Sequence, residues 1–563
     1  MRIRPYLAPA CACVLLAACG KSADTTAPLA FVPADTPYVY ANIEPAPKAV
    51  IEQWSRRMHE YLPAALGVYS RALDRIDATA KPDAVHAIAA ARALIDTLKT
   101  HDTLDKLSEL GLKPDMRVAF YGVGLAPVLR MELGDADKFR ATIADIERKS
   151  GAALPTAKIG DQAYWYVDAG GVVGMLAIEG AQLVATLAPA QASDSLKRTL
   201  FGIDRPAKSL ADAGDLDALA RQYGYTRFGE GFIDIVKIAE RLTSPPQGSD
   251  REIATAFDLP TGGSDAACKA EYLDIAHKFP RLVMGVGELS PQRVRVGAQL
   301  EMQPALATQL AATLGAAPGT GAPGEGIVDV ALSVPVLKLK DFLIVQANAV
   351  AAKPFTCASL AQLNAGFADL KAKIDITVPP PASDLSGIRF TLDSFALGAT
   401  PDAKPNVTGK LLMATDNPAV VLAMSQMAMP PLKDLKLAAD GKPVALPAGT
   451  IPYLEQPAFA AMSAKALAVA VGTGEDAGLG AYLNAPAANE PVFWRMHFSG
   501  KFYGMLASAF NRMQAMLPAD KQAELAQQAK MMATYENWIR FADIEMVATP
   551  TGIALRETVE QNP

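Results

Sequence analysis

Apolar and polar residues alternate in many short segments of this chain. Residues 37–45 (PYVYANIEP) and residues 327–335 (IVDVALSVP) are two such segments, and each ends at a proline. Alternation puts the apolar side chains on one face of a β-strand. Proline cannot donate to a strand ladder, so it ends the strand. Both segments are therefore predicted to be half-buried strands with the same end signal.

Further strands lead into predicted helices. Residues 129–133 alternate and run toward Asp135, and residues 410–414 run toward Asp416. An aspartate at a helix start can accept backbone N–H bonds and suits the positive end of the helix. A helix is also predicted over residues 518–538, where Pro518 precedes an Ala- and Gln-rich stretch.

Two hairpins close the pattern. Residues 281–300 alternate on both sides of a Ser-Pro-Gln turn, and residues 539–559 alternate around Thr-Pro-Thr-Gly. A third matched pair consists of residues 182–187 and 466–471. Because the paired segments come in the same order at nearly constant offset, the sequence predicts an internal duplication. Chance similarity among Ala- and Leu-rich segments is the alternative.

Gly- and Pro-rich joints divide the chain, most clearly at GAAPGTGAPGEG, residues 315–326. The predicted parts are a signal peptide (1–18), a lipidated tether (19–30), a long unit (31–204), a short unit (205–318), a linker (319–326), a second long unit (327–486) and a second short unit (487–563).

Short, half-polar strands are typical of antiparallel sheets rather than of doubly wound parallel ones. The predicted fold class is therefore α+β, internally duplicated, with antiparallel sheets and hairpins and with helices packed on one face.

Composition excludes some classes of protein. The chain has 563 residues, of which 50% are hydrophobic and 20% charged, so several units with their own cores are expected. The formal net charge of −6, without a basic stripe, argues against a nucleic-acid partner. The most apolar internal stretch, residues 326–350, contains Asp329, Lys338, Lys340 and Asp341, which makes membrane insertion costly.

The N-terminus carries the most specific motif. Arg2 and Arg4 precede an apolar stretch over residues 7–18 that is typical of a signal peptide. Leu16-Ala17-Ala18-Cys19 resembles the lipobox of bacterial lipoproteins. This resemblance implies cleavage before Cys19 and acylation of Cys19, which would bind the chain to a lipid bilayer. Gly20 in place of aspartate implies the outer membrane, on its periplasmic side or at the cell surface. An ordinary cleaved signal peptide is the alternative.

Cysteine use agrees with that location. Cys11 and Cys13 would leave with the signal peptide and Cys19 would be acylated, which leaves Cys268 and Cys357. An isolated pair in an oxidising compartment predicts a disulfide, with two free thiols as the alternative.

Candidate chemistry is sparse. The five histidines form no metal-ligand spacing, and the sequence has neither HExxH nor Gly-x-Ser-x-Gly. The Gly-Val-Gly segments at 122–124 and 285–287 are interpreted as strand glycines rather than phosphate loops. We therefore predict no catalytic residue, no metal site and no cofactor.

Two further patterns have a functional and a structural interpretation. Asp234 and Asp329 share the pattern Glu-Gly-x-x-Asp, which suits either a ligand-binding carboxylate or a solvent-facing edge strand. Methionines gather at 424–429 and 505–532, where they could fill a core or line an adaptable groove. We favour the edge strand and the core.

Three functions are compatible with these observations. The first is a non-enzymatic envelope lipoprotein that acts as a binding or scaffolding module, with an envelope protein as partner. The second is a carrier of an apolar or lipid ligand, and the third is an enzyme with a carboxylate site between the repeats. The segment Pro33–Pro37 resembles uncharacterised proteobacterial lipoproteins, and this resemblance implies no activity. Ligand, biological process and oligomeric state stay open.

Overall fold

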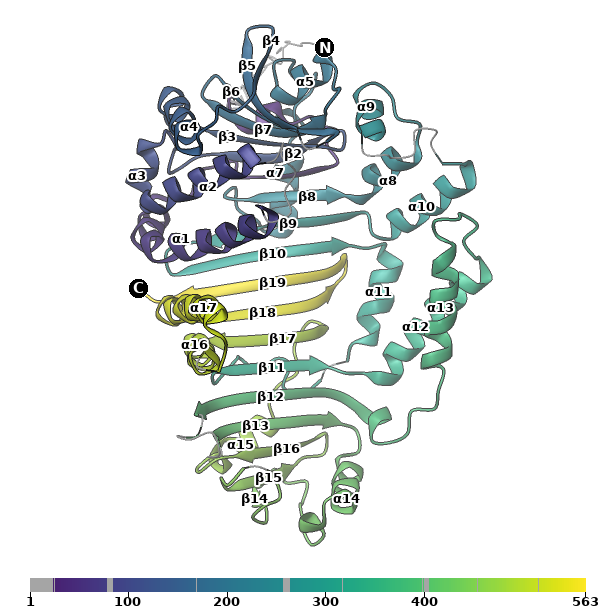
Figure 1. Ribbon diagram of the computed structural model, residues 1–563. Coiled ribbons are helices and arrows are strands. Elements are labelled where there is room, and N and C mark those ends of the chain that lie inside the picture. Colours follow the sequence, from purple (N-terminus) through teal and green to yellow (C-terminus); the bar gives the residue numbers. More distant parts are fainter. Residues whose placement is uncertain are drawn as a thin grey trace, which may run out of the picture.

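A single sheet organises this chain. The computed structural model describes residues 24, 26–77, 85–168, 170–256, 264–315, 317–396, 398, 405–452, 454–514 and 516–563. These residues form one sheet of 19 strands in which every neighbouring pair is antiparallel (Figure 1). The predicted signal peptide and Cys19 lie outside the described residues.

The strands lie side by side in one unbroken series, from β4 at the top of Figure 1 to β14 at the bottom. The first ten in spatial order are β4 (Thr156–Ile159), β5 (Gln162–Asp168), β6 (Val172–Glu179), β7 (Gln182–Pro189), β3 (Ala126–Glu132), β2 (Val118–Val123), β1 (Tyr38–Ala41), β8 (Glu230–Asp234), β9 (Arg281–Leu289) and β10 (Arg293–Glu301). The next nine are β19 (Gly552–Gln561), β18 (Ile539–Thr549), β17 (Val492–Ser499), β11 (Val328–Ser333), β12 (Leu385–Ala396), β13 (Asn406–Thr415), β16 (Ala466–Val471), β15 (Ala458–Met462) and β14 (Val444–Ala445).

The helices connect and cover these strands. In chain order they are α1 (Lys48–Asp77), α2 (Val85–Thr100), α3 (Leu104–Glu109), α4 (Ala136–Ser150), α5 (Asp194–Phe201), α6 (Leu210–Ala213), α7 (Asp215–Tyr223), α8 (Ile235–Thr243), α9 (Ser249–Ala256), α10 (Ala266–Lys278), α11 (Pro304–Thr313), α12 (Val336–Ala352), α13 (Ala361–Ile374), α14 (Pro418–Ala428), α15 (Asp476–Leu483), α16 (Gly500–Gln514) and α17 (Ala519–Trp538). Short 3₁₀ helices occur at Pro28–Phe31, Ala382–Asp384 and Pro430–Leu432.

Strand register separates the two faces of the sheet. Paired residues on neighbouring strands share a face, and successive residues along a strand alternate between faces. We call the side that carries Arg495, Arg556 and Glu545 the arginine face, and the side that carries Phe120 and Leu555 the apolar face.

Helices pack on both faces. On the arginine face, Leu196 and Leu200 of α5 share a buried cluster with Tyr121 and Val128. On the apolar face, the ring of Phe498 on β17 lies 4.8 Å from that of Phe502 on α16. The α+β class and the antiparallel pairing are therefore confirmed, whereas separate sheets and helices on one face only are wrong. Because both faces are apolar along much of the sheet, both need cover.

The two predicted hairpins are confirmed as β9–β10 and β18–β19. Asp135 caps α4 as predicted, since its side chain accepts the N–H groups of Asp137 and Lys138. Asp416 does not cap α14, because Pro418 occupies the first helical position and Asn417 the cap. A proline there has no N–H to satisfy, so the helix starts without a carboxylate.

Cys268 on α10 and Cys357, in the segment between α12 and α13, form the predicted disulfide. The carboxylate of Glu271, one turn along α10, accepts the backbone N–H groups of Thr356 and Cys357 at 2.8 and 3.0 Å. The covalent link and these hydrogen bonds together hold α10 against the segment that follows α12.

The predicted linker, residues 319–326, contains no helix or strand, but it is not a free spacer. Thr320 and Ala322 are buried. The N–H of Gly321 donates to the carbonyl of Pro486 at 3.0 Å. The Gly- and Pro-rich composition therefore serves close packing here rather than extension.

Asp329 is the clearest departure from expectation. It lies on β11, which is paired on both sides by β12 and β17, and its side chain is fully buried. Arg389 donates to it from Nε at 3.1 Å and from the terminal amide at 2.5 Å. Asp234 also lies on an internal strand, β8, and caps α8 by accepting the N–H of Lys237. The interpretation of both residues as solvent-facing on edge strands is wrong, because strand order places both strands inside the sheet.

Replacing Asp329 by asparagine tests the importance of this ion pair. Asp329→Asn removes the buried carboxylate of Arg389 and leaves it only the half-exposed Glu325 at 3.1 Å, so we expect the free energy of unfolding to fall by about 3–5 kcal/mol. Urea denaturation measures the change. The matched control is Asp416→Asn, since Asp416 pairs with Lys465 with both side chains exposed. Its expected effect is below about 1 kcal/mol. Equal, small effects of both substitutions would contradict the assignment.

Candidate ligand-binding groove

One row of residues crosses nearly the whole apolar face without a charge. We call it the apolar row, and it follows the strand register from one neighbour to the next. Its members, from β5 to β15, are Trp165, Leu176, Ala185, Leu129, Phe120, Tyr40, Gly231, Met284, Ala298, Leu555, Met546, Trp494, Leu332, Ile388, Met413, Leu467 and Met462. At about 4.8 Å between strands, the row is roughly 75 Å long.

Four residues of the apolar row are open to solvent. The exposed fractions are 38% for Leu129, 44% for Phe120, 41% for Tyr40 and 42% for Leu555. Leu129, Phe120 and Tyr40 are register neighbours and form a contiguous apolar surface, and such surfaces mark interaction sites.

Helices border the row. At the centre of the sheet α16 and α17 lie at one end of the strands and α11 at the other (Figure 1). Phe502 of α16 packs on Phe498, and Leu310 of α11 shares a cluster with Met302 and Ile553 of the apolar face. Leu555 lies exposed between these contacts, and we call the apolar row with its bordering helices the groove.

The groove deepens at its second end into an apolar hollow of about 380 Å³. Its floor is the apolar face of β12, β13 and β16, where Phe390, Leu411 and Val469 lie in one register line. Its opposite wall comes from α14 and the segment after it, through Leu422, Met429, Leu432, Leu435, Leu446, Ile451 and Leu454. An apolar hollow with few polar groups suits an acyl chain or another apolar ligand.

Four of the clustered methionines are not core residues. Met424 is 44% exposed and Met427 is 87% exposed, and on α16 and just after it Met513 and Met516 are also exposed. The core interpretation is therefore wrong for these four, and none of them lines the hollow.

Carboxylates do not gather into a site. Asp543 pairs with His497 at 2.7 Å, and Glu545 pairs with Arg556 at 3.2 Å. In the part of the chain that the structure describes, no group of three or more His, Cys, Asp or Glu side chains could hold a metal ion.

Among the buried acids of the described residues, Glu230 on β8 is the exception, because its carboxyl oxygens accept no hydrogen bond. It lies on the arginine face with its side chain fully buried, and neither carboxylate oxygen has a hydrogen-bond partner. Burial raises the pKa of this carboxyl to about 7. The charge of Asp217 adds to the increase, and that of Arg227 opposes it. The group is therefore buried in its neutral form at mildly acidic pH.

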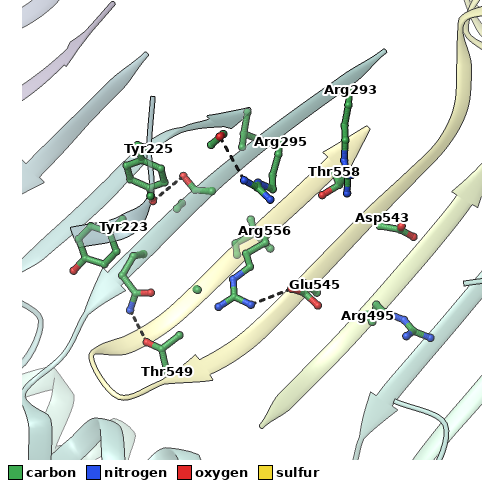
Figure 2. Close-up of a pocket in the computed structure, with 18 of the residues that line it drawn as sticks. Tyr223, Tyr225, Arg293, Arg295, Arg495, Asp543, Glu545, Thr549, Arg556 and Thr558 are labelled. Atoms are coloured by element: carbon green, nitrogen blue, oxygen red, sulfur yellow. Dashed lines mark hydrogen bonds and ion pairs between the residues drawn. The ribbon is translucent and has the colours of Figure 1, made fainter. Parts of the chain in front are cut away.

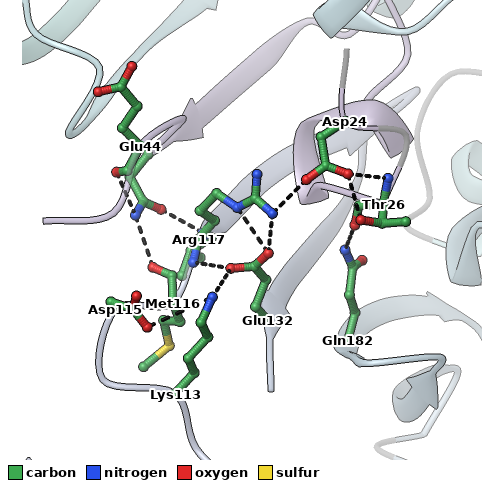
Figure 3. Close-up of polar contacts among 11 residues, drawn as sticks. Asp24, Thr26, Glu44, Lys113, Asp115, Met116, Arg117, Glu132 and Gln182 are labelled. Atoms are coloured by element: carbon green, nitrogen blue, oxygen red, sulfur yellow. Dashed lines mark hydrogen bonds and ion pairs between the residues drawn. The ribbon is translucent and has the colours of Figure 1, made fainter. Parts of the chain in front are cut away.

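The chain is fixed close to its predicted anchor (Figure 3). The carboxylate of Asp24 accepts from Arg117 at 2.9 Å, and Arg117 also pairs with Glu132 at the end of β3. Gln182, at the start of β7, donates to the carbonyl of Thr26. Hydrogen bonds from Thr26 and Arg117 lower the pKa of Asp24 to about 2, so this contact is charged at neutral pH. The described chain thus begins at the ends of β2, β3 and β7.

Comparisons with protein-family models, curated proteins and solved structures give no match for this chain. Among the described residues, no helix has the length and apolarity needed to cross a bilayer. The case for a function therefore depends on the groove itself.

Sequence reasoning named Cys268 and Cys357 but missed the groove. Every strand that contributes to the row alternates, and alternation alone was taken to mean one buried face. The available signal was one uncharged set of alternate positions in these strands: Val328, Val330 and Leu332 in one, and Ala542, Ile544 and Met546 in another. Only the register shows that these positions form one line.

Titration of Glu230 gives a stability test. Between its ordinary pKa of 4.5 and about 7, the folded chain binds a proton that the unfolded chain has lost. The free energy of unfolding should therefore fall as pH rises through this window, by about 3 kcal/mol in total. Glu230→Gln cannot ionise and should remove that part of the slope in urea denaturation at pH 4.5 to 8. The exposed Glu240→Gln should keep it, and a slope retained in both variants would exclude Glu230 as its source.

Proposed function

We propose that this chain is a non-enzymatic carrier that binds a lipid or another elongated apolar ligand along the apolar row. The observation that carries this proposal is the uncharged line of 17 residues with its open aromatic and leucine side chains. Covering apolar surface yields about 25 cal/mol per Å², so an extended acyl chain would gain affinity along its whole length. A scaffold that binds a folded partner needs no such continuous line.

Two methionines in the hollow support the same function. Met413 on β13 and Met429, just after α14, line it. Methionine side chains are flexible and polarizable, so they adapt to apolar ligands of different shape. A carrier that loads and releases its ligand benefits from such a lining.

The proposed lipid anchor would place one end of the groove at a membrane. Asp24 is fixed to the ends of β2 and β3, which carry Phe120 and Leu129 of the apolar row. Five residues of chain reach at most about 18 Å, so an acylated Cys19 would hold these strands near the bilayer. The hollow lies near the other end of the row, far from that anchor.

We also propose that the sheet arose by internal duplication. Support comes from strand order: β7-β3-β2-β1-β8-β9-β10 in the first half corresponds to β16-β13-β12-β11-β17-β18-β19 in the second. In this correspondence the exposed Phe120 and Leu129 match the exposed Phe390 and Leu411. Each repeat would then supply half of the groove.

Lipid binding can be measured on the protein released from its anchor by Cys19→Ala. We expect copurifying lipid in solvent extracts by mass spectrometry and saturable binding of a dansylated fatty acid. Phe120→Asn and Leu555→Asn should each weaken dye binding about five- to tenfold, because each removes part of a large apolar contact. Neither substitution should lower the melting temperature by more than a few degrees, since both side chains are partly exposed.

The matched control is Ile376→Asn, an exposed apolar residue outside the groove. It should bind the dye as tightly as the parent protein. Absence of both lipid and dye binding, or equal losses in the control, would refute the carrier proposal.

Acylation of Cys19 is tested separately. Mass spectrometry of the mature protein should find Cys19 as the first residue with attached acyl chains, and Cys19→Ala should abolish the modification and leave the chain uncleaved or released from membranes. An unmodified N-terminus elsewhere would disprove the anchor. It would leave the groove experiment unaffected.

A further inference from the structure

The arginine face holds a second concave site at the centre of the sheet, on the opposite side from the groove (Figure 2). Its volume is about 1080 Å³, and its floor is formed by β10, β19, β18 and β17. Tyr223 and Tyr225 stand at one side, and Pro323 and Gly324 at the other. We call this site the central hollow.

Its lining carries more positive than negative charge. Five arginines line it against two carboxylates, those of Asp543 and Glu545. The arginines are Arg293, Arg295, Arg495, Arg540 and Arg556. The central hollow therefore has an excess of positive charge in a chain whose formal net charge is −6.

Part of this positive charge is not neutralised by neighbours. Arg556 pairs with Glu490 and Glu545, and Arg540 pairs with Glu560. Among the described residues, no carboxylate lies within ion-pair distance of Arg295 or Arg495, as the dashed lines of Figure 2 also indicate. Two guanidinium groups thus keep a positive charge without a paired carboxylate.

Arg495 is the key residue because its donors are buried and unused. Its Nε and one terminal amide, Nη2, are shielded from solvent and have no hydrogen-bond partner. Burial lowers the pKa of Arg495, although an arginine in a protein remains protonated. A buried donor without an acceptor costs stability, so such groups usually mark a bound water, an ion or a functional site.

Two other buried arginines on this face, Arg389 and Arg130, donate to acceptors within the fold. Arg389 donates from Nε and from a terminal amide to Asp329, and Arg130 donates to Gln182 and to the carbonyl of Phe201. The fold therefore supplies acceptors where it buries an arginine for structural reasons. At Arg495 the fold supplies no acceptor for Nε and Nη2, which are the two nitrogens through which Arg389 donates.

We propose that the central hollow binds a phosphorylated ligand whose phosphates pair with Arg495 and Arg295. A guanidinium presents its N–H groups as a planar fork that matches the oxygens of a phosphate. A phosphate group carries about −1.5 to −2 charges at neutral pH, which suits the uncompensated cations better than one carboxylate does. Hydroxyl groups of Thr549, Thr551 and Thr558 lie on the same surface. This site is distinct from the proposed carrier function, because its arginine side chains and those of the apolar row lie on opposite faces of the sheet.

Isothermal titration with myo-inositol hexakisphosphate tests the proposal, with uncharged myo-inositol as the control ligand. The full-length protein in nonionic detergent, at about 0.15 M salt to screen distant charges, should bind the hexakisphosphate at one site and should not bind inositol. Arg495→Gln should weaken binding tenfold or more, and Arg295→Gln severalfold. Arg512→Gln, an exposed arginine on α16 that does not line the central hollow, should stay within twofold.

Arg495→Gln should fold well, because the arginine has no partner to lose at these two donors and its removal relieves an unsatisfied buried charge. Arg495→Lys provides a second variant that keeps the charge but lacks the fork, and it should also bind less tightly. Unchanged affinity in both variants, or no binding by the parent protein, would overturn the proposal.

The same phosphate chemistry can come from a soluble molecule or from a lipid head group. Phosphatidylglycerol in nonionic micelles, with phosphatidylcholine as the zwitterionic control, separates these sources. Competition of phosphatidylglycerol with the hexakisphosphate, lost in Arg495→Gln, supports a head-group ligand. If phosphatidylglycerol does not compete while the hexakisphosphate still binds, the result supports a soluble phosphorylated ligand.

Discussion

The ladder between β10 and β19 is the interaction on which the rest of the molecule depends. Nine residue pairs, from Arg293–Glu560 to Glu301–Gly552, join the strands that end the two halves of the chain. Antiparallel pairing keeps the side chains of each half on matching faces across this seam. A slip of one residue would exchange the faces and place Arg295 beside apolar neighbours. The continuous apolar row and the central hollow both require this one register.

The two faces of the sheet differ in the ionisable groups that they carry. On the arginine face, Asp329 and Arg389 bond to each other, whereas the carboxyl group of Glu230 and two donor nitrogens of Arg495 have no hydrogen-bond partner. On the apolar face the row has no ionisable group except the phenol of Tyr40. One sheet thus offers two chemically distinct surfaces back to back, and a ligand suited to one has no favourable contact on the other.

Local patterns in the sequence predicted local structure well. The hairpin β18–β19 follows from alternation around a short turn, and the cap at Asp135 follows from one side chain beside one helix start. The burial of Asp329 could not be predicted in this way, because it depends on β17 arriving from more than 150 residues away. The exposure of Met427 could not be predicted either, because it depends on which segments pack against α14. The apolar row is the extreme case, since its members come from 17 strands and only long-range pairing puts them in line.

A sheet this long has just two free edges, and both are poor templates for further pairing. At one end β14 spans only Val444–Ala445, and at the other β4 spans Thr156–Ile159 and carries Lys158. Very short edge strands and edge lysines discourage the addition of another chain. The fold therefore limits its own growth: the ladder can be extended by duplication within one polypeptide, but it resists extension into a fibre by addition of further molecules.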